Sequence, residues 1–226
     1  GSIPTLLAPD GKTFRPSLLD FLQALLSGAI REDEIEREAL AQIEKLQRAG
    51  ISVTHLDTHK HTHLFPAVSR PLLRLAHRCS VKAVRNPFEP AWSSRLAPNA
   101  FTRRLQFHIL SVLGKKSFLS LPQLRHGQVL TSNGTIGVSA TGQLNAASLH
   151  SILYAMPEGT WELVCHPGYN DAALAAITTR LRTTREIERE ALLKEIPKAI
   201  RTLPGLELVH YGQIGYGQTD PPGIGD

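Results

Sequence analysis

The stretch THLDTHKHTHLFP, at residues 54–66, joins a predicted strand to a predicted helix and contains four histidines and one aspartate. Asp57, His59, His61 and His63 are spaced by two, so in extended backbone their side chains would point to the same side. Imidazole and carboxylate groups are ligands of Zn²⁺ and similar divalent ions. The spacing therefore predicts a metal or catalytic site, with at least one more ligand from elsewhere. A solvated turn, or histidines bonded to backbone carbonyls, is the alternative.

Apolar spacing around this stretch predicts alternating helices and strands. The predicted helices cover residues 16–27, 32–49, 66–78, 100–113 and 144–154. A last helix begins with a capping box of Thr183 and Glu186, and Pro197 should break or restart it. The predicted strands cover residues 51–57, 81–84, 135–138, 161–165 and 206–209. This alternation is typical of an α/β fold with a parallel sheet, although about five strands are fewer than a closed eight-stranded barrel requires.

The composition indicates one globular domain. Of the 226 residues 42% are hydrophobic, and we expect a domain over residues 3–211, a cloning scar at residues 1–2 and a disordered tail over 212–226. Lys and Arg number 25 against 20 Asp and Glu, but no long basic run occurs, so we expect no nucleic-acid partner. No apolar run reaches the ~18 residues that span a bilayer, and no secretory signal is present. Cys79 and Cys165 form no CxxC pattern, which favours a reducing cytoplasm.

A second histidine follows a predicted buried strand in WELVCHPGYND, at residues 161–171. His166 could act as a general acid, since histidine titrates near neutral pH, or it could simply be bonded within a turn. Because parallel strands end on one face of a sheet, we expect the segments of His59 and His166 to share a cavity. Arg85 follows the strand over 81–84 and is expected to bind a substrate oxygen or orient a carboxylate, unless it only packs at the rim. Trp92 and the helix over 100–113 either cover a substrate or are ordinary packing.

Residues 55–66 closely resemble the YdjC-like carbohydrate deacetylases. The match continues at residues 83–85, 136–139, 141–142, 165–169 and 185–188, and extends to about residue 211. AVRNPFEP at residues 83–90 and HKH at residues 59–61 look most like the branch associated with hopanoid biosynthesis. The resemblance implies a (β/α) barrel-like fold and the metal-dependent removal of an N-acetyl group from an amino sugar.

The resemblance also implies roles for individual residues. His59 matches a ligand of a divalent ion, Mg²⁺ or Zn²⁺, and His166 matches an active-site histidine that stabilises the transition state or protonates the leaving group. Asp57 is a candidate catalytic residue, or one that orients His59. The candidate substrate-binding residues are Arg85, His61, His63 and Tyr169.

Two motifs of the family are absent from this sequence. In the family that the chain resembles, members begin with a strand ending in Ala-Asp-Asp-Phe-Gly and carry a later Gly-x-His, and these motifs are expected to supply further metal ligands and the catalytic base. Asp10, in a turn before Gly11, is no substitute. We therefore expect the chain to start just after that region and its barrel to be incomplete. The alternative function is a non-catalytic sugar- or lipid-binding remnant.

The expected partner is an N-acetylated amino sugar or a glycolipid. If the hopanoid branch applies, contact with a membrane surface is also expected. Because missing strands would leave sheet edges exposed, we further expect copies of the chain to associate as a homo-oligomer.

Overall fold

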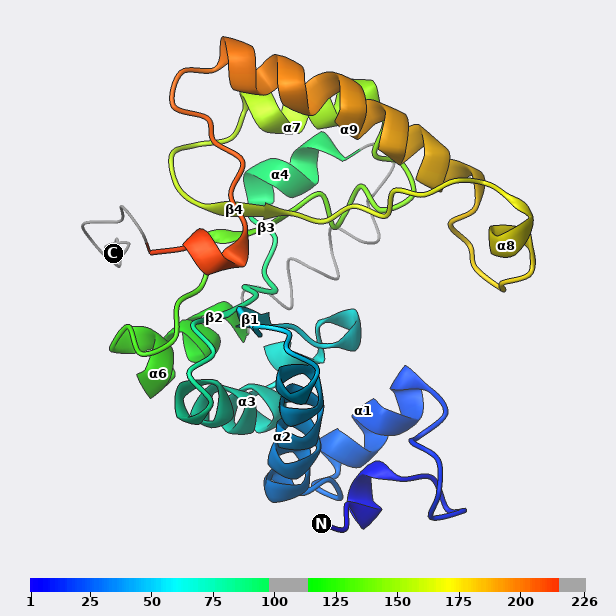
Figure 1. Cartoon of the computed structure of the whole chain (residues 1–226), viewed down its shortest axis with the longest axis vertical. Helices are drawn as coiled ribbons and strands as arrows, with labels where there is room; N and C mark the ends of the chain where they lie inside the picture. The colour runs from blue at the N-terminus through cyan, green and yellow to red at the C-terminus, as the bar shows by residue number, and fades with distance from the viewer. Residues whose placement is uncertain (98–113, 216–226) are drawn as a thin grey trace. The chain divides into compact units, whose positions relative to one another are not determined.

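The computed structural model describes residues 1–97 and 114–215, which divide into two compact units (Figure 1). The first unit contains residues 1–84 and 114–131, and the second contains residues 85–97 and 132–215. The whole of the helix predicted over 100–113, and most of the predicted tail, lie outside the described residues. The single domain predicted over residues 3–211 stays a prediction.

The first unit places three helices where the sequence predicts them. Its elements are η1 (Pro4–Leu6), α1 (Leu18–Leu26), α2 (Glu32–Arg48), β1 (His55–Leu56), η2 (His59–Leu64), α3 (Pro66–Arg78), β2 (Ala83–Val84) and α6 (Pro122–Arg125). The Ser17 side chain caps α1 by accepting the N–H of Asp20, and Pro66 occupies the first turn of α3, where its missing N–H is not needed. Gly50 ends α2 with a positive φ of 75°.

A short parallel ladder forms the centre of the first unit. β1 pairs with β2 in the register His55↔Ala83 and Leu56↔Val84, and Ala83 also bridges Leu130 in parallel. α3 packs against α2 and buries Leu73, Leu75 and Ala76 completely. The predicted strand over 51–57 shrinks to two residues, and Ile51, at the start of the predicted strand, is 51% exposed.

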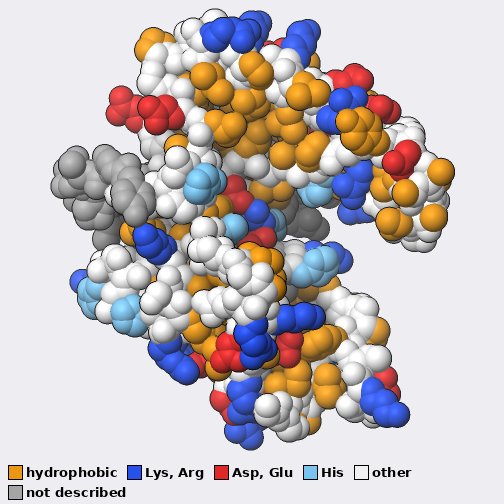
Figure 2. All heavy atoms as spheres, in the orientation of Figure 1, with side chains coloured by type: hydrophobic (Ala, Val, Ile, Leu, Met, Phe, Trp, Pro, Cys, Tyr) orange, Lys and Arg blue, Asp and Glu red, His pale blue; other side chains and the backbone are white. Residues whose placement is uncertain are grey.

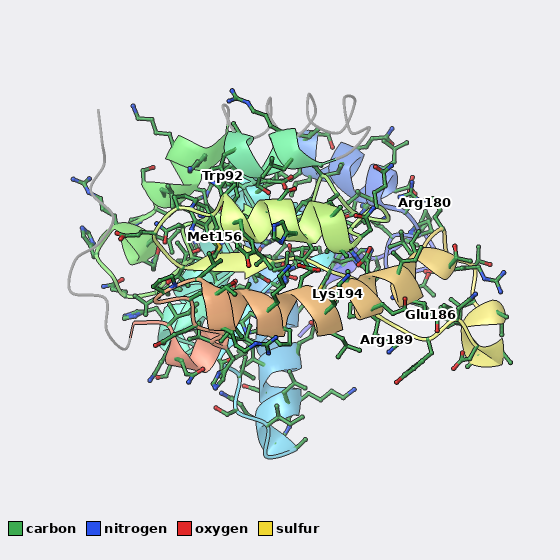
Figure 3. The ribbon with its side chains drawn as sticks, turned by 90° about the horizontal axis from the view of Figure 1, so that it is seen from above. Trp92, Met156, Arg180, Glu186, Arg189 and Lys194 are labelled. Carbon is green, nitrogen blue, oxygen red and sulfur yellow. The ribbon has the colours of Figure 1, made fainter. Side chains whose placement is uncertain are left out.

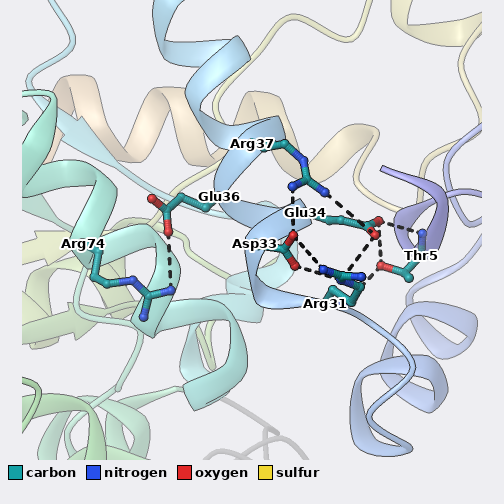
Figure 4. A network of polar contacts seen from close by, with 7 residues as sticks. All are labelled: Thr5, Arg31, Asp33, Glu34, Glu36, Arg37 and Arg74. Carbon is teal, nitrogen blue, oxygen red and sulfur yellow. Dashed lines mark hydrogen bonds and ion pairs between the residues drawn. The ribbon is translucent and has the colours of Figure 1, made fainter. Parts of the chain in front are cut away.

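Charged residues at the start of α2 join it to the N-terminal segment (Figure 4). Glu34 is buried and accepts hydrogen bonds from the Thr5 backbone N–H at 2.7 Å and from the Thr5 hydroxyl at 2.8 Å. Asp33 pairs with Arg31 at 3.0 Å and with Arg37 at 2.8 Å. These contacts fix η1 on α2. The acidic residues in the first turn of α2 also interact favourably with the positive end of the helix dipole.

The second unit combines a two-stranded parallel sheet with two packed helices. Its elements are α4 (Ala91–Leu96), β3 (Gly134–Ile136), α7 (Ala146–Tyr154), β4 (Trp161–Leu163), α8 (Ala172–Ala175), α9 (Thr183–Thr202) and η3 (Tyr211–Gln213). β3 and β4 pair in the register Gly134↔Trp161, Thr135↔Glu162 and Ile136↔Leu163. α7 lies beside α9 and buries Leu149 and Ile152 (Figure 1). Both units thus have parallel strands, which confirms a mixed α/β fold; the described residues form no closed barrel.

α9 differs from its prediction at both ends. Arg182 precedes its first turn without a side-chain cap, so the predicted capping box of Thr183 and Glu186 is wrong. The helix also runs through Pro197 to Thr202 instead of breaking. Proline leaves the carbonyl four residues earlier without its usual donor. That carbonyl belongs to Leu193, which is 66% exposed, so water can supply the missing hydrogen bond.

The predicted strand over 206–209 is also wrong, because these residues are irregular and pair with no strand among the described residues. Apolar side chains lie at the surface over α7 and α9 (Figure 2), where Tyr154, Leu193 and Ile200 are exposed. No helix in the described ranges combines the length and apolar character needed to cross a bilayer. Association between copies stays a prediction.

Candidate functional site

The histidine segment of the first unit, residues 55–63, is not extended beyond β1. Residues 59–64 form η2, in which Lys60 has φ 52° and ψ 32° and His61 has φ 57° and ψ 33°. This left-handed backbone is uncommon for residues other than glycine and turns the chain sharply. The prediction that side chains two apart point the same way is therefore wrong: His59 is exposed, whereas His63 is fully buried.

His63 is the centre of a small polar cluster. The Thr58 hydroxyl accepts the His63 backbone N–H at 2.9 Å and lies 2.7 Å from its Nδ1. Asp57 Oδ1 is 3.9 Å from the same nitrogen, and the His61 ring lies edge-on with its centroid 6.4 Å away. The Phe118 ring packs against the His63 ring, with the two centroids 6.2 Å apart. The structure thus brings Asp57, His61 and His63 together, an arrangement suited to orienting a neighbouring group more than to contacting a substrate.

The described residues do not form a metal site by themselves. Within residues 1–97 and 114–215, no group of three or more His, Cys, Asp or Glu side chains is gathered so that it could hold an ion. His59 lies on η2 with its side chain exposed. The Mg²⁺ or Zn²⁺ ion implied by the resemblance stays a prediction, and it would need donors beyond those that the described residues bring together.

The turn after β4 carries His166 and is bonded to α9. The Val164 N–H donates to the Ile136 carbonyl at 3.0 Å and extends the ladder by one residue. Two further residues then bond to α9: the His166 N–H donates to Glu188 Oε2 at 2.5 Å, and the Gly168 N–H donates to the Arg185 carbonyl at 3.2 Å. The turn at Pro167 and Gly168 is therefore held in one place.

The His166 ring has one buried and one accessible side. Its Nδ1 is buried and lies 3.9 Å from Glu188 Oε2, while the side chain as a whole is 34% exposed. Among the described residues, Nδ1 has no partner within hydrogen-bond distance. A histidine with a carboxylate on one side and solvent on the other is well suited to proton transfer.

Glu188 is a residue to which the sequence assigned no role. It is only 1% exposed, and its Oε1 accepts the Gly142 N–H at 3.2 Å. Burial, and next the charge of Glu188, raise the pKa of the Cys165 thiol. The available sequence signal was the stripe Glu188, Ala191, Glu195 and Ala199, which falls on one helix face and is buried.

Glu89 is a second buried carboxylate that the sequence did not single out. Its Oε1 accepts the Ser93 hydroxyl at 2.8 Å and the Gly137 N–H at 3.1 Å. Its Oε2 accepts the Ser139 N–H at 2.8 Å and the Ser139 hydroxyl at 2.6 Å. Glu89 therefore fixes the loop that follows β3, as Glu188 fixes the turn that follows β4.

Arg85 orients a carboxylate, which is one of the alternatives that the sequence left open. Its Nε donates to Glu162 Oε1 at 2.7 Å, its Nη2 donates to the same oxygen, and the Tyr211 hydroxyl donates to Glu162 Oε2. Burial, and next the bond to Glu162, raise the pKa of Tyr211. Glu162 thus joins β4 to η3 through Tyr211, and to the segment that begins at Arg85.

Tyr169 is exposed and lies beneath the guanidinium of Arg189, 4.8 Å from the ring centroid. Arg189 also pairs with Glu186 at 3.8 Å, and both project from α9 (Figure 3). The candidate substrate-binding residues of the second unit, Arg85 and Tyr169, therefore each contact a charged partner. Since His59 belongs to the first unit and His166 to the second, the cavity that they were predicted to share stays a prediction.

Comparison with known proteins places the chain in a family. The sequence pattern of the YdjC-like proteins matches residues 1–201. A carbohydrate deacetylase from Mus musculus is 30% identical over 179 residues, which are 73% of this chain and 54% of that protein. A carbohydrate deacetylase from Geobacillus stearothermophilus is 28% identical over 192 residues, 84% of this chain and 62% of that protein. The chain spans about half the length of the curated relatives it matches.

One solved structure is similar in fold. The crystal structure of a proposed cellobiose-phosphate cleavage protein from Enterococcus faecalis V583 superposes with a TM-score of 0.62 at 20% identity. The match covers 93% of this chain and 69% of that chain, so almost all of this chain follows the same fold. Together with the match over residues 1–201, this shows that the chain belongs to the YdjC-like family.

Proposed function

We propose that the protein is a carbohydrate deacetylase that hydrolyses the acetamide of an N-acetylated amino sugar. The observation that carries the proposal is His166 at the end of a parallel strand, with one ring nitrogen facing the buried carboxylate of Glu188. Membership of a family whose curated members include carbohydrate deacetylases supplies the substrate class.

His166 would deliver a proton to the leaving nitrogen. Attack of water on the acetamide carbon gives a tetrahedral intermediate, which collapses to acetate only if the amine leaves as a protonated group. Histidine is a common proton donor in enzymes, and the His166 side chain is partly exposed. Asp57, on the other unit, is proposed as a second acid–base residue, and Arg85, His61, His63 and Tyr169 as residues that position the sugar or its neighbours.

Metal dependence is a separate part of the proposal. His59 would contribute one imidazole to a divalent ion, Mg²⁺ or Zn²⁺, completed by other donors. Such an ion would polarise the acetamide carbonyl and make bound water more acidic. Isothermal titration of the chain with Zn²⁺, compared with His59→Ala, tests this part: we expect binding that the substitution weakens, and equal binding by both proteins would remove His59 as a ligand.

The most specific part of the proposal concerns the molecule to which the amino sugar is attached. The resemblance to the hopanoid-associated branch favours an amino sugar attached to a polycyclic lipid. Faster turnover of a lipid-linked N-acetylated glycoside than of the free sugar would support this choice, while equal rates would favour a soluble carbohydrate.

Acetate release tests the reaction itself. The chain is incubated with N-acetylglucosamine conjugates and divalent metal, and wild type is compared with His166→Asn and with His150→Asn as a matched control on α7. We expect acetate from wild type and from the control, and at least a ~100-fold slower rate from His166→Asn. Sugar binding without any acetate from wild type would instead indicate a non-catalytic binding protein.

A further inference from the structure

Two glutamates lie on the buried face of α9, and each faces a histidine. Glu188 and Glu195 are seven residues apart, or about two helical turns, and alternate with the buried Ala191 and Ala199. A carboxylate buried in an apolar helix face is unfavourable unless hydrogen bonds or charges compensate it. Glu195 has His150 Nδ1 at 3.3 Å, and Glu188 has the turn of His166. The pair of Glu188 and His166 lies at the candidate site. The pair of Glu195 and His150 is not part of the His166 turn and serves as a matched comparison.

The carboxylate of Glu188 is fixed by backbone groups that follow two different strands. Its Oε1 accepts the N–H of Gly142, in the loop after β3, and its Oε2 accepts the N–H of His166, after β4. Because each oxygen has its own backbone donor, the carboxylate cannot rotate without losing a bond. Glu188 is therefore a fixed acceptor against which the His166 ring is set.

The side of the His166 ring that faces Glu188 determines which nitrogen carries the proton. Nδ1 is buried 3.9 Å from Glu188 Oε2, with no other partner in hydrogen-bond distance among the described residues. A ring N–H is attracted to a nearby carboxylate, whereas a ring lone pair is repelled by it. The neutral ring should thus keep its proton on Nδ1, and Nε2 becomes the nitrogen that exchanges a proton with another molecule.

We propose that Glu188 is a positioning residue for His166, holding the ring in the orientation and tautomer that presents Nε2 to the leaving nitrogen. This inference rests on the proposed deacetylation. In the step concerned, the C–N bond of the tetrahedral intermediate breaks and its electron pair goes to nitrogen. The proton from Nε2–H of the charged ring forms the new N–H bond, and the ring is left neutral with Nδ1–H towards Glu188.

The first test needs no change at Glu188. Long-range ¹H–¹⁵N spectra of histidine-labelled wild-type protein at about pH 8.5, where histidines are ordinarily neutral, report the tautomer of each ring. His166→Asn identifies the signals of His166. We expect the Nδ1–H tautomer to dominate for His166, and a dominant Nε2–H tautomer would overturn the proposal whether or not the protein is an active deacetylase.

The second test compares Glu188→Gln with Glu195→Gln. Both replace a buried glutamate on the same helix face, so both share the cost of altering α9. We expect Glu188→Gln to lower kcat for acetate release about 100-fold or more with little change in KM, and to erase the tautomer preference of His166. Glu195→Gln should change neither.

Three outcomes are informative. Equal kcat losses in the two variants would show that Glu188 has only a structural role, and would overturn the proposal. If Glu188→Gln does not fold, the wild-type tautomer still decides. If wild type releases no acetate but shows the Nδ1–H tautomer that Glu188→Gln loses, the proposed function fails while the geometric inference stands.

Discussion

The histidine segment of the first unit and the His166 turn of the second both follow a short parallel strand, but different chemical groups hold them. In the first unit a hydroxyl, that of Thr58, contacts both the backbone N–H and the ring of His63. In the second, a buried carboxylate, that of Glu188, accepts the backbone N–H of His166 and faces its ring. Each ring also has a carboxylate oxygen 3.9 Å from its Nδ1, that of Asp57 at His63 and that of Glu188 at His166, but the His63 side chain is fully buried whereas that of His166 is 34% exposed. The difference in exposure favours the proposal that His166 takes part in the reaction, and leaves His63 to support the fold and, at most, to orient its neighbours.

The two units also differ in where they place left-handed backbone. Among the described residues, Lys60, His61 and Ser80 have positive φ without being glycine, and all three belong to the first unit. In the described part of the second unit, every residue with positive φ is glycine. A non-glycine residue in this conformation costs about 1–2 kcal/mol. The histidine segment is therefore strained, whereas the loops after β3 and β4 are not.

The largest expected effect is on the carboxylate that anchors the second unit. Glu89→Ala removes the acceptor of two backbone N–H groups and two hydroxyls, so we expect the free energy of unfolding to fall by about 3–5 kcal/mol in chemical denaturation. Glu190→Ala, which removes an exposed partner of Arg189, is the control and should cost less than about 1 kcal/mol. Equal losses would show that Glu89 is not the anchor.

The corresponding change in the first unit should be smaller, because a hydroxyl is lost instead of a carboxylate. Thr58→Val keeps the shape of the side chain but removes the hydroxyl that contacts both the His63 N–H and its ring, at a cost of about 2 kcal/mol. Thr58→Ser retains the hydroxyl and should stay within about 1 kcal/mol of wild type. If valine and serine gave the same denaturation midpoint, the polar cluster around His63 would contribute nothing to stability.

Tyr211 makes the second unit sensitive to high pH. Its pKa is raised in the folded protein, so its contribution to stability is complete below the unfolded value of about 10 and is lost as the pH rises above it. Between about pH 10 and 11 we expect wild type to lose about 1 kcal/mol more than Tyr211→Phe. Parallel stability curves for the two proteins over this range would contradict the buried hydrogen bond to Glu162.

The smallest effect is a gain in the strained segment. Lys60→Gly relieves the left-handed residue but adds freedom to the unfolded chain, so we expect a net stabilisation of about 0.5–1 kcal/mol. Gly137→Ala should act in the opposite direction, because its φ is 83° and a Cβ would lie 3.1 Å from the Val164 carbonyl oxygen. A destabilised Lys60→Gly would mean that the left-handed turn carries no strain.

The helices were predictable because their signals are local. The apolar spacing of α2 and α3 does not depend on the rest of the chain. Neither do the stop signal at Gly50, after α2, and the start signal at Pro66, in α3. The ends of the strands were harder to predict. Ile51, for example, is a β-branched residue typical of strands, but it is 51% exposed in the first unit.

The site was only half predictable for a physical reason. The position of His166 follows from its place after an apolar strand, but the buried partners do not. Glu89 and Glu188 look like surface residues in the sequence, and only tertiary packing brings four donors to one and two to the other. The left-handed turn at Lys60 and His61 likewise could not be predicted, because it contains no glycine, the usual sequence signal for positive φ.

The measurement that tests the comparison most directly is the rate of acetate release from an N-acetylated amino sugar by three proteins of verified fold: wild type, His166→Asn and Thr58→Val. If His166 performs chemistry and His63 supports the fold, kcat falls at least ~100-fold in His166→Asn, whereas Thr58→Val loses stability but keeps kcat within a few fold. An unchanged kcat in His166→Asn would contradict this assignment of the two histidines.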